Sequence, residues 1–163
     1  MKVIPRAISH VGLNVTDMEA AISWYERVFG FTLIAPPVTF KADGSEMGDV
    51  LADLLGEQIK EVKIAHLSAS GGVGLELFQF INPESKRYSS HDYWQGGFFH
   101  LSIIDPNIEE AIERIVANGG KQRSEIWSSV PGTDYKMAYC EDPDGNLIEI
   151  YTHSVERMYS NLG

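Results

Sequence analysis

Four polar residues stand out because each lies among apolar residues in a segment with strand-like alternation: His10, Glu76, His100 and Glu149. A carboxylate in the middle of an apolar strand is costly to bury unless it is paired or bound to a metal ion. Two imidazoles with two carboxylates suit a borderline divalent metal, and four protein ligands leave octahedral positions open for water or substrate. These residue types predict a site for one divalent ion of nickel, zinc, cobalt, manganese or iron.

The neighbours of these residues indicate which face of a strand each one occupies. Leu75 and Leu77 flank Glu76, and isoleucines flank Glu149 in the same way. Since successive strand side chains point to opposite faces, the aliphatic residues would pack under helices and the polar ones would project from the other face. A lone histidine or glutamate on a strand is more often a surface or core residue than a ligand. The repeated order of His then Glu favours ligation.

The elements that must position these residues follow the order strand, helix, three strands, and this order occurs twice. In the first half we expect a strand at 7–15, a helix from Asp17 to Gly30, a strand at 31–36, a helix at 46–56, and strands at 61–69 and 73–80. In the second half we expect a strand at 97–104, a helix from Asn107 to Gly119, and strands at 121–127, 134–140 and 146–153. A polar loop at 81–95 separates the halves, and the tail from residue 154 has no clear pattern.

Matching positions indicate that the second half duplicates the first. Asp17 lies seven residues after His10, and Asn107 lies seven after His100; both residue types are common helix N-caps. The apolar strands LELF and IEIY also match at the end of each half. We therefore predict an α+β protein with two tandem βαβββ modules. Residues 1–90 form the first, with an inserted helix near 46–56, and residues 91–163 form the second with the C-terminal tail.

Composition excludes several classes of partner. The 163 residues contain 13 basic and 23 acidic side chains, a net charge of −10, which disfavours nucleic acid and anionic membrane surfaces. No apolar stretch approaches the roughly 20 residues of a membrane helix, and the N-terminus lacks the apolar core of a signal peptide. One cysteine rules out an intrachain disulfide. We expect a cytoplasmic protein that acts on a small molecule.

The remaining chemistry-bearing residues have plainer interpretations. His66 lacks a matching partner in the second half, His91 lies in the polar loop, and His153 follows the last strand. All three are interpreted as structural or surface residues. Cys140 is interpreted as a small buried hydrophobe. Aromatic side chains on strands are more often core residues, but five of them are candidates for lining a substrate pocket: Phe78, Phe80, Phe98, Tyr139 and Tyr151.

Four segments resemble the vicinal-oxygen-chelate superfamily: SHVGLNVTDMEAAISWYERVFGF, GLELF, FFHLSI and EDPDGNLIEIY. That superfamily includes glyoxalase I, methylmalonyl-CoA epimerase, the extradiol dioxygenases, and the fosfomycin and bleomycin resistance proteins. The resemblance covers nearly the whole chain. It implies one glyoxalase-like domain in which two βαβββ modules form curved mixed sheets around a metal site, often within a homodimer.

The set His10, Glu76, His100 and Glu149 resembles the metal ligands of bacterial glyoxalase I. That resemblance implies a metal-dependent lyase or isomerase that transfers a proton beside a metal-bound enediolate. The metal would act as a Lewis acid on the substrate oxygens. By the same resemblance, Glu149 is the base that removes and returns the proton, and Glu76 is the opposing carboxylate.

Two positions depart from the glyoxalases that use glutathione. Those enzymes resemble one another in an Arg and an Asn, each four residues after a ligand of the first module. The corresponding residues here are Asn14 and Phe80, so the cation for the glutathione carboxylate is missing and an apolar ring replaces an amide. The insertion at 36–62 is also absent from the compact bacterial enzyme. We therefore expect a small oxygenated substrate that is not a glutathione adduct, with Asn14 among its contacts.

Two alternatives remain open. The first is a ring-cleaving extradiol dioxygenase, which the chain resembles in His10, His100, Glu149 and Tyr139. The catalytic histidine of those enzymes would fall near Ser85, which cannot act as a base. The second is a non-catalytic antibiotic-binding protein, although such members generally lack a complete ligand set.

Overall fold

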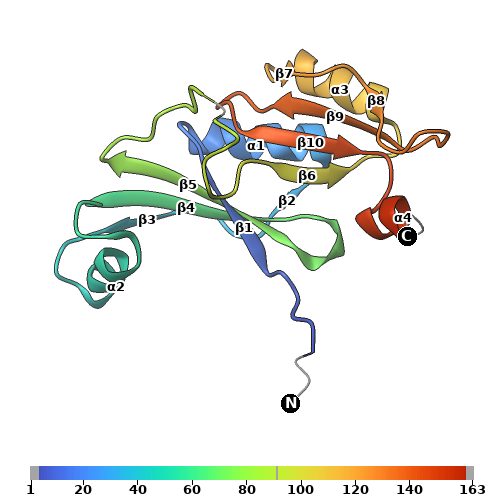
Figure 1. The fold of residues 1–163 in the computed structure, drawn as a ribbon. Helices are drawn as coiled ribbons and strands as arrows, with labels where there is room; N and C mark the ends of the chain where they lie inside the picture. Colours follow the sequence, from blue (N-terminus) through green and yellow to red (C-terminus); the bar gives the residue numbers. More distant parts are fainter. Residues whose placement is uncertain (1–3, 91, 161–163) are drawn as a thin grey trace. The chain divides into compact units, whose positions relative to one another are not determined.

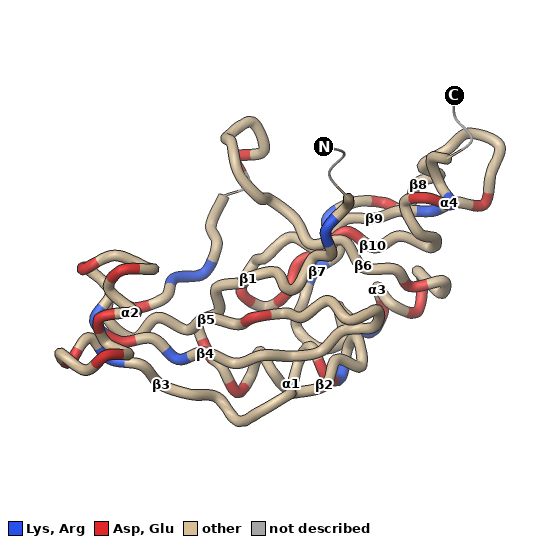
Figure 2. Tube along the Cα trace, turned by 90° about the horizontal axis from the view of Figure 1, so that it is seen from below, with Lys and Arg blue, Asp and Glu red and all other residues tan. Residues whose placement is uncertain are grey.

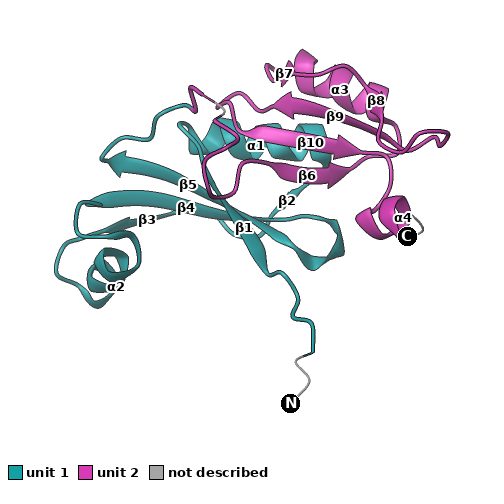
Figure 3. Cartoon of the chain, in the orientation of Figure 1, with its two compact units in different colours: residues 1–87 teal, residues 88–163 magenta. Residues whose placement is uncertain are grey.

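The structure is a computed structural model that describes residues 4–90 and 92–160. The chain divides into two compact units, residues 1–87 and 88–163 (Figure 3). Each unit contains one five-stranded mixed sheet with at least one helix packed on it. The predicted α+β class and the two similar halves are confirmed.

The first unit contains β1 (His10–Asn14), α1 (Met18–Phe29), β2 (Thr32–Leu33), β3 (Val38–Lys41), α2 (Glu46–Leu55), β4 (Glu61–Ser68) and β5 (Gly74–Asn82), with a short 3-10 turn at Ser70–Gly72 (Figure 1). The strand order is β1-β5-β4-β2, and β3 also pairs with β4. β1 runs parallel to β5, while the other pairs are antiparallel. The opening strand therefore lies beside the closing strand of its own unit.

The second unit repeats this arrangement with β6 (Leu101–Ile104), α3 (Ile108–Ala117), β7 (Lys121–Gln122), β8 (Trp127–Ser128), β9 (Lys136–Glu141), β10 (Leu147–Tyr151) and α4 (Val155–Tyr159). The strand order is β6-β10-β9-β7, and β8 also pairs with β9. Again the opening strand is parallel to the closing one. The common topology brings the residues after each opening His next to the strand that carries a Glu.

Local sequence explains where the first helix begins and ends. The Asp17 side chain accepts a hydrogen bond from the Ala20 amide at 3.0 Å, which satisfies one of the free donors of the first turn. Gly30 ends the helix in a left-handed conformation, φ 68°, that residues with a Cβ rarely adopt. Trp24 and Tyr25 are fully buried under this helix. Both predicted boundaries of α1 are confirmed.

The alternation predicted for the closing strands is also confirmed. Leu75, Leu77, Ile148 and Ile150 are all fully buried. Cys140 on β9 is buried as well, in agreement with its interpretation as a small hydrophobe. Burial raises the pKa of the Cys140 thiol to about 11 because the thiolate would lose its hydration. In each unit, the aliphatic face of the sheet thus belongs to the buried core, and the polar residues point to the other face.

The second strand of each unit is broken in two, which the alternation pattern did not predict. β2 and β3 both pair with β4, at Ser68–Leu67 and at Ile64–Glu61, and residues between them leave the ladder. Pro36 and Pro37 lie in this gap and have no amide hydrogen to contribute. In the second unit β7 and β8 pair with β9 in the same way. There the Ser124 hydroxyl accepts from the Tyr139 amide at 2.9 Å and replaces a ladder bond.

Two further expectations are corrected, and the tail, for which no element was expected, is described. The strand predicted at 97–104 is shorter and begins at Leu101, so His100 lies one residue before it. Asn107 precedes α3, but its side chain makes no capping hydrogen bond there. The tail contains the short helix α4, whose first turn is capped by the Ser154 hydroxyl. His91 lies outside the described residues, and no helix within those residues has the length and apolarity to cross a membrane.

Candidate functional site

Glu76 in the first unit lies between two histidines. Glu76 is on β5, and β1 and β4 run along its two sides. The Nε2 atom of His10 is 3.1 Å from Glu76 Oε2, and the Nε2 atom of His66 is 3.1 Å from Glu76 Oε1. The Glu76 side chain is 18% exposed. Each carboxylate oxygen therefore has its own imidazole partner.

His66, interpreted from the sequence as a structural or surface residue, is half exposed and lies beside Glu76. His66 on β4 is directly opposite Glu76 in the antiparallel register, which puts the two side chains on the same face of the sheet. The rings of His66 and His10 approach edge to face with centroids 6.5 Å apart. His66 lies ten residues before Glu76 in the sequence. In the β4–β5 hairpin this spacing places the two residues opposite each other.

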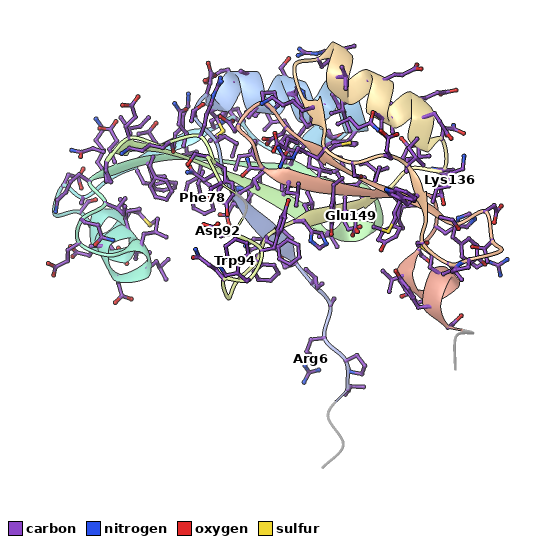
Figure 4. The ribbon with its side chains drawn as sticks, turned by 45° about the horizontal axis from the view of Figure 1, so that its top comes forward. Arg6, Phe78, Asp92, Trp94, Lys136 and Glu149 are labelled. Atoms are coloured by element: carbon purple, nitrogen blue, oxygen red, sulfur yellow. The ribbon has the colours of Figure 1, made fainter. Side chains whose placement is uncertain are left out.

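The second unit contains the equivalent pair. The Nε2 atom of His100 is 3.2 Å from Glu149 Oε2. Glu149 is on β10 (Figure 4), and the residue is 5% exposed, which is unusual for a glutamate without a strong partner. His100 precedes β6 and is held by the rings of Phe99 and Tyr139, at centroid distances of 4.6 and 5.6 Å.

Tyr139 occupies the position in the second unit that His66 occupies in the first. Tyr139 is opposite Glu149 in the β9–β10 register, and it too lies ten residues before its glutamate. Its phenol lies close enough to the Glu149 carboxylate for that negative charge to act on it. Burial, and then the negative charge of Glu149, raise the pKa of Tyr139, so the phenol keeps its proton and remains a donor. Each unit therefore has a histidine, a central glutamate and a polar side chain on the adjacent strand.

His100 carries an unusual buried polar atom. Its Nδ1 atom is buried and has no hydrogen-bond partner within residues 4–90 and 92–160. An unpartnered buried nitrogen of this kind costs about 1–3 kcal/mol. Trp24 Nε1 in the core has no partner among these residues either, so this feature alone does not assign His100 a chemical role.

The donor pairs fit a divalent metal in chemistry and spacing. Two donors about 2.1 Å from one ion and at right angles to each other lie about 3.0 Å apart. The nitrogen–oxygen distances of 3.1 and 3.2 Å in the two units are close to this value. Among the described side chains, however, no group of three or more His, Cys, Asp or Glu residues is arranged to hold a metal ion. The structure thus groups the four predicted ligands as two pairs, one in each unit.

The predicted substrate contacts lie in different environments. Phe78 projects from β5 (Figure 4) and lines a cavity in the first unit together with Glu76. Phe80 stacks on Phe78 and packs against the core cluster of Leu51, Ile59 and Val62. Asn14 accepts a hydrogen bond from the Ser85 hydroxyl at 2.6 Å. In the first unit, only Phe78 among the predicted aromatic contacts lines the cavity.

The aromatic candidates of the second unit also differ from one another. Phe98 is 100% exposed, so it has no contacts that would position a ligand. Tyr151 is buried, and its hydroxyl lies 3.0 Å from that of Tyr159 in α4. Burial and this hydrogen bond raise the pKa of Tyr151. Tyr139 alone contacts both members of the His–Glu pair.

The cavity in the first unit has a volume of about 210 Å³. It is lined by residues of β3, α2, β4 and β5: Phe40, Met47, Val50, Leu51, Leu54, Leu55, Ile64, Glu76 and Phe78. Glu76 is the one charged residue in this lining. The cavity therefore connects the carboxylate of the His–Glu–His group to an apolar wall.

Comparison with known proteins agrees with this architecture. The family model described as the Glyoxalase/Bleomycin resistance protein/Dioxygenase superfamily matches residues 7–150. The chain is 27% identical over 142 residues to the lactoylglutathione lyase of Salmonella typhimurium, covering 86% of this chain and 88% of that one. It is 28% identical over 146 residues to lactoylglutathione lyase GLX1 of Arabidopsis thaliana, covering 89% of this chain. It spans only 44% of the length of that plant relative.

Solved structures show the same fold. A glyoxalase family protein from Bacillus cereus superimposes with a TM-score of 0.69 at 22% identity, over 92% of this chain and 95% of that one. A mutant of the fosfomycin resistance protein FosX from Listeria monocytogenes superimposes with a TM-score of 0.63 at 18% identity, over 98% and 100% of the two chains. That FosX structure contains Mn(II) and 1S,2S-dihydroxypropylphosphonic acid. At these identities the likeness shows the fold alone.

Proposed function

Because the chain belongs to the glyoxalase/bleomycin resistance protein/dioxygenase superfamily, we propose that it is a metal-dependent lyase or isomerase that transfers a proton on a small oxygenated substrate. The observation that carries this proposal is the repeated pairing of an imidazole with a carboxylate at 3.1 and 3.2 Å, each supported from the adjacent strand. Curated relatives named lactoylglutathione lyase support the same reaction type.

The proposed ligands of one divalent ion are His10, Glu76, His100 and Glu149. When bound, the metal supplies Lewis-acid polarisation of the substrate oxygens. Nickel, zinc, cobalt, manganese and iron all suit this set of nitrogen and oxygen donors. His66 and Tyr139 support the two carboxylates from the adjacent strands: His66 Nε2 lies 3.1 Å from Glu76 Oε1, and Tyr139 is opposite Glu149 in the strand register.

Glu149 is the proposed base. Its carboxylate lies on a central strand and is almost completely shielded from water, so few water molecules compete with the substrate for its oxygens. Tyr139 supports the carboxylate from the adjacent strand. Glu76 is the opposing carboxylate, and its two imidazole partners leave it less free to move a proton.

The proposed substrate is not a glutathione adduct. Asn14 replaces the cation that would pair with a glutathione carboxylate, and its side-chain oxygen is already bonded to Ser85. Phe80 replaces the amide and packs into the core cluster near α2. Both observations support a substrate without the two carboxylates of glutathione.

Isotope exchange with simple model ketones tests the reaction type. The metal-loaded protein should incorporate deuterium from D₂O at the carbon beside the carbonyl in members of a panel of α-hydroxyketones, measured by proton NMR over many turnovers. Glu149→Gln should reduce the exchange rate about 100-fold or more, since a positioned base contributes roughly 10²–10⁴-fold.

Glu141→Gln is the matched control. Glu141 is a buried glutamate of the same sheet that pairs with Arg123, at 3.3 Å, and not with His100. It should retain exchange within about threefold of the wild type if the effect is specific to a general base. Equal exchange by wild-type and Glu149→Gln protein, or none across the panel with metal bound, would refute the proposal.

The ring-cleaving alternative receives less support. The Ser85 hydroxyl, at the position of the dioxygenase base, is bonded to Asn14 and to the Phe80 amide at 2.8 Å. Neither of these partners is a base that could activate the Ser85 hydroxyl to accept a substrate proton. Oxygen consumption by the iron-loaded protein with catechols would reverse this preference. We also expect a homodimer, which light scattering of the purified protein tests.

A further inference from the structure

The cavity beside Glu76 is built largely by the inserted segment of the first unit. α2 contributes Met47, Val50, Leu51, Leu54 and Leu55 to its wall, and β3, which also lies in the insertion, contributes Phe40. Figure 1 shows α2 next to the ends of β3 and β4. The remaining wall comes from β4 and β5, where Phe78 and Glu76 belong to the polar face of the sheet. The insertion thus extends the candidate site in one direction.

Three of the five wall residues on α2 are exposed although they are apolar. Met47 and Val50 are about half exposed, and Leu54 is 73% exposed. Leu51 is buried on the side of the core. Isolated exposed apolar residues are common, but several that converge on one concave, apolar surface mark a binding site. The cavity therefore has an apolar surface that a ligand could cover.

Two features fix α2 before any ligand arrives. The Ser45 hydroxyl caps the helix by accepting from the Gly48 amide at 3.1 Å. Gly48 also lies so close to β3 that an added Cβ would be 2.7 Å from the carbonyl oxygen of Lys41. Because the helix is held against its strand by backbone packing, the cavity is preformed, and a ligand does not have to order it.

The charge around α2 restricts what the cavity accepts. Residues 42–59 contain five acidic side chains and no basic one: Asp43, Glu46, Asp49, Asp53 and Glu57. Figure 2 shows acidic positions around α2, with basic positions of neighbouring segments close to them. An anionic group at the cavity would face this charge and Glu76 together. The flanking Lys41 and Lys60 do not line the cavity: Lys41 pairs with Glu61, and the Lys60 ammonium donates to the Glu57 carbonyl oxygen. The apolar lining disfavours a charged group of either sign, and the acidic side chains further disfavour an anionic one.

We propose that this cavity binds an uncharged aryl or branched-alkyl substituent of the substrate, with the oxygenated end of the same molecule at Glu76. The placement of the oxygenated end rests on the proposed function. The volume of about 210 Å³ suits a single ring, since an engineered cavity of about 150 Å³ lined by similar side chains binds benzene. α2 is accordingly the element that selects the substrate.

Hydroxamates test this proposal because their chelating head is constant while the substituent varies. Calorimetry with the metal-loaded protein should show benzohydroxamate binding about 10-fold to 30-fold more tightly than acetohydroxamate, as expected for burial of one ring. Adding a carboxylate to the ring, as in 4-carboxybenzohydroxamate, should remove at least about 10-fold of this gain. A ratio near one in the wild type would overturn the proposal.

Val50→Phe places a ring in the cavity and should reduce the preference for benzohydroxamate to about twofold or less, while acetohydroxamate affinity stays unchanged. Val116→Phe is the matched control, because Val116 is a similarly exposed valine on α3 that does not line the cavity. This control should keep the wild-type preference. A preference that survives in Val50→Phe would show that the ring binds elsewhere.

A second measurement separates failure of this proposal from failure of the proposed function. With metal-free protein, benzyl alcohol should shift the NMR methyl signals of Leu51 and Ile64, and Val50→Phe should abolish the shifts. Shifts without any hydroxamate binding would support the apolar cavity and refute the metal site. Hydroxamate binding without ring preference and without methyl shifts would refute the cavity proposal and leave the metal site standing.

Discussion

Removal of the His66 side chain should weaken metal binding although His66 is not a proposed ligand. His66 Nε2 lies 3.1 Å from Glu76 Oε1, while His10 occupies the other oxygen at the same distance. In His66→Ala, Oε1 loses its donor, and the carboxylate can rotate away from the ligand position. Metal binding would then have to order the Glu76 side chain, and this loss of conformational entropy would lower the metal affinity.

The size of the effect follows from the exposure of the pair. Loss of a hydrogen-bond partner of a metal ligand typically costs about 10-fold to 100-fold in metal affinity. The His66 side chain is 51% exposed, so water can replace part of its hydrogen bond. We therefore expect the lower end, about a 10-fold increase in Kd, which equals about 1.4 kcal/mol.

Competition with a chelating dye at constant pH would measure this change. His66→Gln keeps an N–H donor on the strand and should recover most of the affinity, which a purely structural loss would not allow. His153→Ala is the control, since His153 bonds to Thr152 and contacts Tyr135 and not a glutamate. Wild-type affinity in His66→Ala, or equal losses in the alanine and glutamine variants, would refute the positioning role.

Further predictions concern stability. Because burial raises the pKa of Cys140 from 9.0 to about 11, the protonated thiol favours the folded state, and this contribution is full below pH 9 and is lost as pH rises to 11. Urea unfolding at about pH 8 and about pH 10.5 should show a loss about 2 kcal/mol larger in the wild type than in Cys140→Ala. Gly120→Ala should lower the free energy of unfolding by about 1–3 kcal/mol, because the added Cβ would lie 2.5 Å from the Glu141 carbonyl oxygen. Gly96→Ala is the control and should change this free energy little, because the space around Gly96 is open. Asp142→Ala should cost about 2–4 kcal/mol in thermal unfolding, since the buried Asp142 carboxylate accepts from the Asp144 and Asn146 amides at 2.9 and 2.8 Å; equal stability would contradict its role in that turn.

The ends of α1 and the buried faces of the closing strands were predictable because the signals for them are local in the sequence. The helix start at Asp17 and its end at Gly30 depend on capping chemistry that a short sequence window contains. The burial of Leu75 and Leu77 around Glu76 follows from the alternation of side chains along a strand. These local rules were enough to place each proposed ligand on or next to a strand of its sheet.

Features that depend on strand register were not predictable in the same way. His66 joins Glu76 only because β4 and β5 pair at that register, and a single sequence without its turn geometry does not fix a register. The ten-residue spacing shared with Tyr139 and Glu149 was a usable signal, since the internal duplication relates the two hairpins. Pro36 and Pro37 indicate that the strand is interrupted, but they do not indicate that pairing with β4 resumes at Val38.

Exposure was the other source of error. Phe98 is an aromatic residue in a segment with strand-like alternation, yet that segment does not pair, and Phe98 is fully exposed. The sequence pattern of an aromatic pocket residue and of an exposed loop aromatic is the same. Only the position of the segment relative to its sheet distinguishes them.

Metal titration of the purified protein tests the central claim most directly. Calorimetry with zinc, nickel or manganese should give one ion per chain in the wild type. Glu76→Gln and Glu149→Gln should each weaken binding at least about 100-fold, since each removes a charged ligand of the same ion. Two independent ions per chain, a variant that binds as tightly as the wild type, or no uptake at all would contradict the account.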